Sequence, residues 1–141
     1  MTAIHAHQDY LRVLILAVSD HRLRMIVRDI TDALRHRYVG TISAARAVDG
    51  ICKYFVPDGG TRKDGWPVMR EALNITEGYA KSITKISEGP RHAEWDKIPE
   101  SEARETMERA WILLNRFLEL KKRGVQSLPL SEFPLLDVSQ V

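Results

Sequence analysis

The chain has 141 residues, of which 44% are apolar and 28% are charged; this composition excludes a disordered chain and fits one folded domain. The net charge of +2 does not by itself point to nucleic acid, and the longest apolar run, Val13 to Val18, is too short to cross a bilayer. Residues 1–8 lack the pattern of a signal peptide, so we expect a cytoplasmic protein without membrane contact. The single cysteine, Cys52, excludes an internal disulfide, and the lack of zinc-type Cys and His spacing predicts no metal and no cofactor.

Helical periodicity extends along almost the whole chain. Residues 11–18 suit either a short buried strand or the start of a helix, and the lack of a second strand favours the helix. Apolar residues three and four apart then predict helices over residues 20–36, 44–55, 66–73, 76–88 and 100–123. Thr41 or Ser43 is expected to cap the second of these helices, and Trp111 is expected on the core face of the last one.

These elements predict an all-α fold, with a single bundle of about five helices over residues 1–124 and the long last helix at its centre. Residues 125–141 form an irregular tail, because Pro129 and Pro134 forbid a regular helix there. The tail carries five large apolar residues, so we expect it to dock on the bundle or on a protein partner: Leu128, Leu130, Phe133, Leu135 and Leu136.

An early run of arginines offers a basic helix face, in which Arg24 and Arg28 are candidate phosphate-binding residues. The alternative is an ordinary solvated face, since Asp29 and Asp32 oppose the arginines.

The pair Arg91-His92 is the main candidate for chemistry, because Gly89-Pro90 ends a helix directly before it. Histidine can move protons near neutral pH, and arginine can hold a phosphate with its fork of donors. If the pair is functional, we expect it to open to solvent beside the loop of residues 57–65. If it is structural, Arg91 binds helix-end carbonyls or carboxylates and His92 is buried.

Two further arginines are candidate phosphate-binding residues, Arg46 on the second helix and Arg70 on the short third one. Small residues around Arg46 allow another helix to approach closely, so Arg46 is also a candidate for an ion pair. Asp49 and Glu71 are the expected partners.

The order of these motifs resembles that of HEPN-like proteins (higher eukaryote and prokaryote nucleotide-binding). The resemblance extends over roughly residues 41–124 and rests on the Ala-Arg-Ala core within Ser43–Ile51, the spacing of Trp66 and Arg70, and the Arg91-His92 pair. It implies an all-α bundle that pairs into a homodimer.

The resemblance also implies two alternative functions. Active HEPN members are metal-independent ribonucleases in which a His follows an Arg by four to six residues, whereas Arg91 and His92 are adjacent here. We therefore expect a non-catalytic interaction module in a bacterial defence or toxin-related system. The alternative is a ribonuclease or RNA-binding effector in which Arg91 and His92 act together with Arg46 or Arg70.

Overall fold

The structure is a computed structural model that describes residues 3–36, 39–88, 92–94 and 98–138, with the side chains described from residue 8 onward. Six α-helices occupy these residues: α1 Ala3–Ser19, α2 His21–Arg35, α3 Val39–Lys53, α4 Arg62–Leu73, α5 Glu77–Lys85 and α7 Glu100–Arg123. Within the described ranges there is no strand, and one isolated bridge joins Ile75 to Leu136. The predicted all-α bundle is confirmed.

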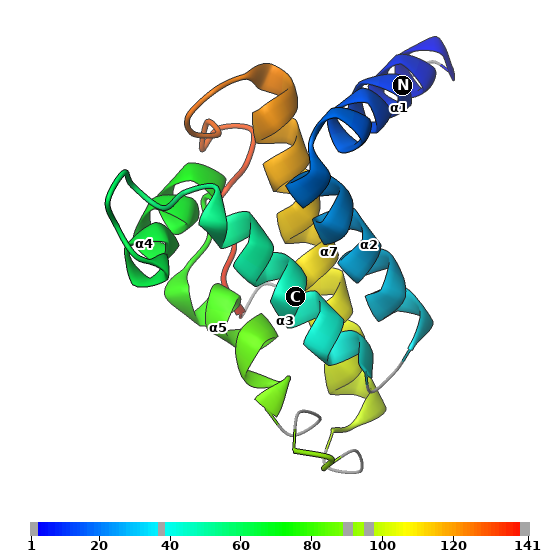
Figure 1. Ribbon diagram of the computed structural model, residues 1–141, viewed down its shortest axis with the longest axis vertical. Coiled ribbons are helices and arrows are strands. Elements are labelled where there is room, and N and C mark those ends of the chain that lie inside the picture. Colours follow the sequence, from blue (N-terminus) through cyan, green and yellow to red (C-terminus); the bar gives the residue numbers. More distant parts are fainter. Residues whose placement is uncertain (1–2, 37–38, 89–91, 95–97, 139–141) are drawn as a thin grey trace.

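The first apolar run is helical, since residues 11–18 lie inside α1 and do not form the alternative strand. Asp20 separates α1 from α2 and caps α2, because its Oδ1 accepts hydrogen bonds from the amides of Arg22 and Leu23 at 2.9 and 3.3 Å. The Tyr54 hydroxyl donates to Asp20 Oδ2 at 2.6 Å and ties this corner to the end of α3. On the N-terminal side of this corner, α1 projects away from the bundle (Figure 1).

The start of α3 differs from the prediction, since Thr41 and Ser43 lie inside the helix, are buried, and do not cap it. Gly40 explains the difference. A Cβ atom there would collide with the Ala33 carbonyl and the Met107 side chain. Gly40 is therefore the point where α3 crosses closely over α2 and α7, and not a break before a helix.

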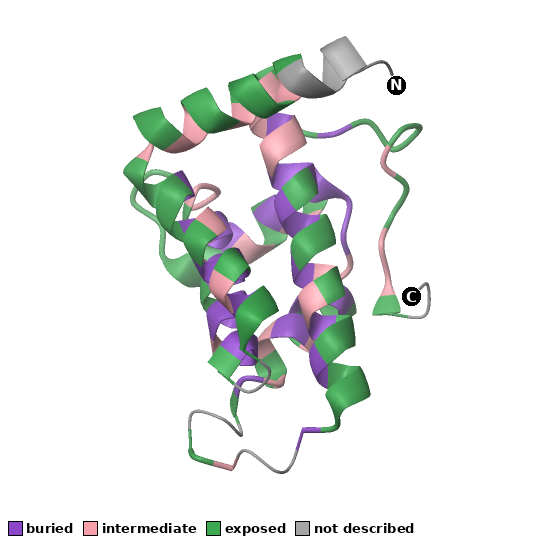
Figure 2. Ribbon diagram, turned by 90° about the vertical axis from the view of Figure 1, so that its right-hand side faces the viewer, coloured by how far each residue is buried: buried purple, intermediate pink, exposed green. Residues whose placement is uncertain are grey.

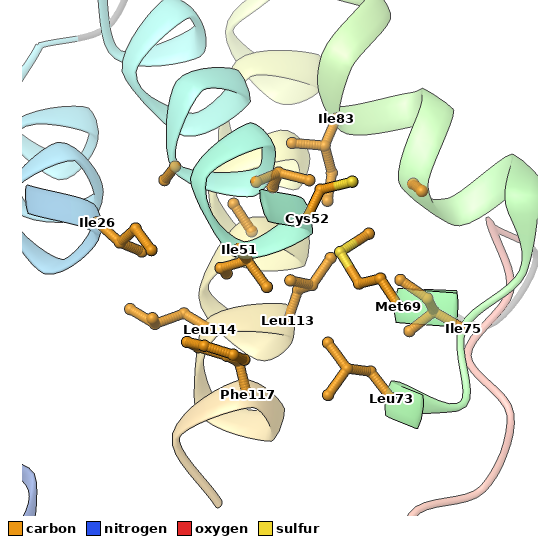
Figure 3. Close-up of a cluster of buried hydrophobic side chains, with 14 of the residues drawn as sticks. Ile26, Ile51, Cys52, Met69, Leu73, Ile75, Ile83, Leu113, Leu114 and Phe117 are labelled. Carbon is orange, nitrogen blue, oxygen red and sulfur yellow. The ribbon is translucent and has the colours of Figure 1, made fainter. Parts of the chain in front are cut away.

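The core lies between α3 and α7 (Figure 3). As predicted, α7 is central, because it contacts all five of the other helices. Ile51 and Cys52 of α3 meet Leu113, Leu114 and Phe117 of α7, and every one of these side chains is at most 2% exposed. Met69 and Leu73 of α4 and Ile83 of α5 close the other side. Burial of each such side chain contributes about 1.5–3 kcal/mol.

The described part of the tail runs back along the bundle of its own chain. The Leu128 amide donates to the Ala72 carbonyl at 2.8 Å, and the Leu136 amide donates to the Asn74 carbonyl at 2.9 Å. Arg116 of α7 is 7% exposed and donates to the carbonyls of Leu73, Asn74 and Pro134 at 2.9, 3.0 and 2.8 Å. One buried guanidinium thus joins α7, the end of α4 and the tail.

Candidate functional site

Arg91 and Trp95 lie outside the described residues, whereas His92 is exposed in the turn between α5 and α7. The exposure of His92 excludes the expectation that it packs in the core. The expected position of His92, beside the loop of residues 57–65, is also wrong. α3 runs towards the loop of residues 57–61, and α5 runs in the opposite direction to the far end of the bundle (Figure 1). The structure therefore does not bring His92 beside that loop.

Glu88 and Ile98, the described residues on either side of residues 89–97, line a groove between α5 and α7 with a volume of about 490 Å³; His92 does not line it. Three carboxylates and two cations line it: Glu88, Glu102, Glu105, Lys85 and Arg109. Arg109 Nε is buried and has no hydrogen-bond partner among the described residues. A terminal nitrogen of the same guanidinium lies 3.6 Å from Glu105. An excess of carboxylates disfavours a phosphate backbone, so this surrounding does not suit RNA.

Arg46 is held by Asp29 of α2, and not by the expected Asp49 or Glu71. Its Nε donates to Asp29 Oδ2 at 2.9 Å, and a second guanidinium nitrogen binds Asp29 Oδ1. The hydrogen bond to Asp29 raises the pKa of Arg46. Asp49 is bound instead by Arg62 from the start of α4. The close α2–α3 crossing allows this partner choice, which is not visible in sequence spacing.

Arg46 lines a groove of about 670 Å³ between α2 and α3, together with Arg22, Lys53 and Arg62. Arg24 and Arg28 do not line it. Arg24 approaches the ring nitrogen Nδ1 of His21 at 3.0 Å, and Arg28 lies 3.8 Å from Asp32 on the exposed face of α2. These two arginines thus belong to the solvated face that was the alternative reading of this run.

Arg70 lines a different groove, of about 400 Å³, between α4 and α5. Three further cations share this groove: Arg62, Lys63 and Lys81. Trp66 and Pro67 form its apolar wall, and the Arg62 guanidinium lies 5.5 Å from the centre of the Trp66 ring. Sequence reasoning missed this cluster as a unit. The signal was present, because residues 62, 66 and 70 are four apart and share one face of α4.

Exposed apolar side chains occur on α1, α2 and α7, three helices that lie on one side of the molecule (Figure 2). On α1 the exposed large side chains are Tyr10, Leu11, Leu14, Ile15 and Val18. A groove of about 590 Å³ between the end of α2 and the start of α7 is lined by the large apolar residues Leu34, Met107 and Trp111. Four charged side chains also line it: Arg35, Glu100, Arg104 and Glu108.

Trp111 is 48% exposed, so its predicted place in the core is wrong. The buried positions of α7 form a face that is rotated about the helix axis away from Trp111: Ala103, Thr106, Ala110, Leu113, Leu114, Arg116, Phe117 and Leu120. Trp111 lies at the border of this face and lines a groove beside the last residues of α2, Ala33, Leu34 and Arg35, which leave it partly exposed.

Other chemistry finds little support in the described residues. The Cys52 thiol is fully buried, and burial raises its pKa to about 11, as expected for a structural cysteine. No group of three or more His, Cys, Asp or Glu side chains in the described ranges is placed to hold a metal ion. None of the helices described has the length and apolar character required to cross a membrane.

Comparison with known proteins gives one match. No curated protein and no solved structure matches the chain. Residues 9–122 match a protein family, and this range contains most of α1, all of α2 to α5, and α7 up to Lys122. The chain therefore belongs to the family described as the C-terminal domain of the domain of unknown function DUF8168.

Proposed function

We propose that this protein is a non-catalytic helical interaction module that works as a homodimer in the cytoplasm, in a defence or toxin-related system of the kind that the HEPN resemblance implies. The observation that carries the proposal is the exposed stripe on α1. Leu11, Leu14, Ile15 and Val18 are spaced as i, i+3, i+4 and i+7, and each is between 41% and 66% exposed. A stripe with this spacing normally faces a packing partner.

The packing partner that best fits the α1 stripe is a second copy of the chain. A 17-residue helix is about 25 Å long and about 10 Å across. One face of this helix buries much less surface area than the roughly 800 Å² per partner that a stable interface requires. The groove between the end of α2 and the start of α7, which contains Leu34, Met107 and Trp111, supplies additional apolar area.

A stripe and a groove on the same chain allow a reciprocal contact. In a two-fold dimer, α1 of each copy lies in the α2–α7 groove of the other copy, so both apolar features are used twice. The projection of α1 from the bundle leaves its stripe accessible for such an exchange (Figure 1).

The second candidate function is a ribonuclease or RNA-binding effector that uses Arg91 and His92, and the exposure of His92 favours it. The carboxylates around the α5–α7 groove speak against it. Incubation of a mixed RNA pool with the protein in chelator tests it directly. Cleavage that disappears in a folded His92→Ala variant would replace the non-catalytic proposal.

Sedimentation velocity at micromolar concentration tests the dimer. We expect a species of twice the 16.1 kDa chain mass. Ile15→Glu should give a folded monomer, because a buried unpaired carboxylate together with the lost apolar contact costs at least about 3 kcal/mol, roughly a hundredfold in Kd. Leu130→Glu is the matched control, since Leu130 is 63% exposed on the tail, away from the proposed interface. A wild-type monomer, or equal dissociation in both variants, contradicts the proposal.

A further inference from the structure

The α4–α5 groove concentrates positive charge that the fold does not neutralise. Four cations and one carboxylate line it. Arg62 is bound by Asp49, and Lys81 is bound by Glu77 at 2.5 Å. Lys63 and Arg70 form no salt bridge with any carboxylate in the described part of the chain.

Arg70 is the more informative of these two cations, because it is half-buried. A guanidinium withdrawn from water loses hydration, and that loss is normally offset by a carboxylate or by carbonyl acceptors. Arg116, the buried arginine on α7, has three carbonyl acceptors. The carboxylate that lines the groove, Glu77, is bound by Lys81. The hydrogen bond from Lys81 lowers the pKa of Glu77 and the charge of Arg70 helps to lower it, but Arg70 forms no salt bridge with Glu77. The fork of donors on Arg70 therefore remains available for an anion that enters the groove.

The shape of the groove adds a second requirement on the ligand. Its volume of about 400 Å³ is in the range of small-molecule sites, about 300–1,000 Å³. Trp66 and Pro67 make one wall apolar, and an indole ring beside cations is the arrangement that accepts a base next to a phosphate. Inorganic phosphate would use the cations but not this wall.

We propose that the α4–α5 groove binds a nucleoside phosphate, with the phosphate held by Arg70 and Lys63 and the base placed against Trp66. This binding site is separate from the dimer interface proposed above, because α4 and α5 lie on the side of the molecule away from α1 and α2 (Figure 1). The ligand is either a free mononucleotide or one nucleotide of an RNA strand, since both present the same group.

Isothermal titration with adenosine 5′-monophosphate, adenosine and inorganic phosphate tests the chemistry, and anisotropy with a labelled single-stranded RNA tests the second source. We expect the monophosphate to bind more tightly than adenosine or phosphate alone. Arg70→Gln should weaken binding at least about tenfold, which is the scale of one charge-assisted pair of hydrogen bonds. Arg28→Gln removes the same charge from an exposed residue on α2 and should change the affinity by less than about twofold.

The outcomes separate clearly. Monophosphate binding that depends on Arg70 identifies a free nucleotide, and RNA binding alone with the same dependence identifies a strand. Where the monophosphate binds, Trp66→Leu should remove its preference over inorganic phosphate; where RNA alone binds, Trp66→Leu should weaken the binding of RNA. The proposal is overturned if neither probe binds at millimolar concentration, or if Arg70→Gln and Arg28→Gln weaken binding equally. Circular dichroism of each variant checks that the helices remain folded.

Discussion

Arg116→Met is the substitution that tests the packing of this fold most sharply. Methionine keeps the apolar stem of the side chain in the core but removes every donor. Three carbonyls then lose the guanidinium, those of Leu73, Asn74 and Pro134. The loss of the guanidinium affects the three carbonyls to different degrees. The Asn74 carbonyl still accepts from the Leu136 amide, and Pro134 is exposed, so water can reach its carbonyl.

The Leu73 carbonyl carries most of the cost, because Leu73 is fully buried and would be left without a partner. An unsatisfied buried acceptor costs about 1–3 kcal/mol, and the weakened bonds to the other two carbonyls add about 1 kcal/mol. The substitution also removes the cost of burying a charged guanidinium, and this offsets part of the loss. That cost is visible in the pKa of Arg116, which burial lowers. We expect a net decrease of about 2–3 kcal/mol in the free energy of unfolding.

Urea denaturation measures this change as a shift of roughly 1 M or more in the midpoint, for a slope of about 1–3 kcal/mol per M. Hydrogen exchange locates it, since the amides of Leu128 and Leu136 should lose protection before those of α3. Arg28→Met on the exposed face of α2 is the control and should change stability by less than about 0.5 kcal/mol. If Arg116→Met behaves like this control, the guanidinium does not hold the tail.

Three other predictions follow from single residues. Asn74 has a φ of 54° and donates from Nδ2 to the Leu128 carbonyl at 2.9 Å, so Asn74→Ala should destabilise more than Asn74→Gly by about 1 kcal/mol in urea titrations; equal losses would show that backbone strain is unimportant. Cys52, with its pKa raised to about 11, should resist alkylation at pH 8 until urea unfolds the chain, and rapid labelling of the native protein would contradict its burial. Tyr54→Phe should cost about 1 kcal/mol at pH 7. The Tyr54 hydrogen bond lowers the pKa of Asp20 below 3.8, so this difference is present above pH 3.8 and should shrink as the pH falls through the lowered pKa; a constant difference down to pH 2 would refute it.

The helices were predictable because their signals are local. Apolar spacing, the Asp20 cap and Gly124 after Arg123 depend only on neighbouring residues. The helix choice for residues 11–18 was also correct, although the sequence offered no reason for its apolar stripe to stay exposed. The predictions that were wrong concern features that depend on tertiary contacts. The start of α3 was placed too late because the role of Gly40, the close crossing with Ala33, involves a residue on another helix.

The candidate site was less predictable, for the same reason. Arg46 was expected to pair with Asp49 or Glu71, yet Asp29 binds it across the α2–α3 crossing. Arg70 was selected singly, whereas its surroundings depend on Lys81 from the next helix. The sequence reveals which side chains are suited to bind phosphate, but their number in one groove is set by how α4 and α5 pack.

Cross-linking between two differently labelled copies tests the central claim most directly. One protein carries Leu14→Cys on the α1 stripe, and the other carries Leu34→Cys in the α2–α7 groove; buried Cys52 stays unreactive in both. Treated with a short bismaleimide, the mixture should yield a covalent dimer of one copy of each, in clear excess over dimers formed by either protein alone. A mixture that stays uncross-linked, or that reacts no faster than Leu14→Cys mixed with Leu130→Cys, would contradict a homodimer built on the exchange of α1.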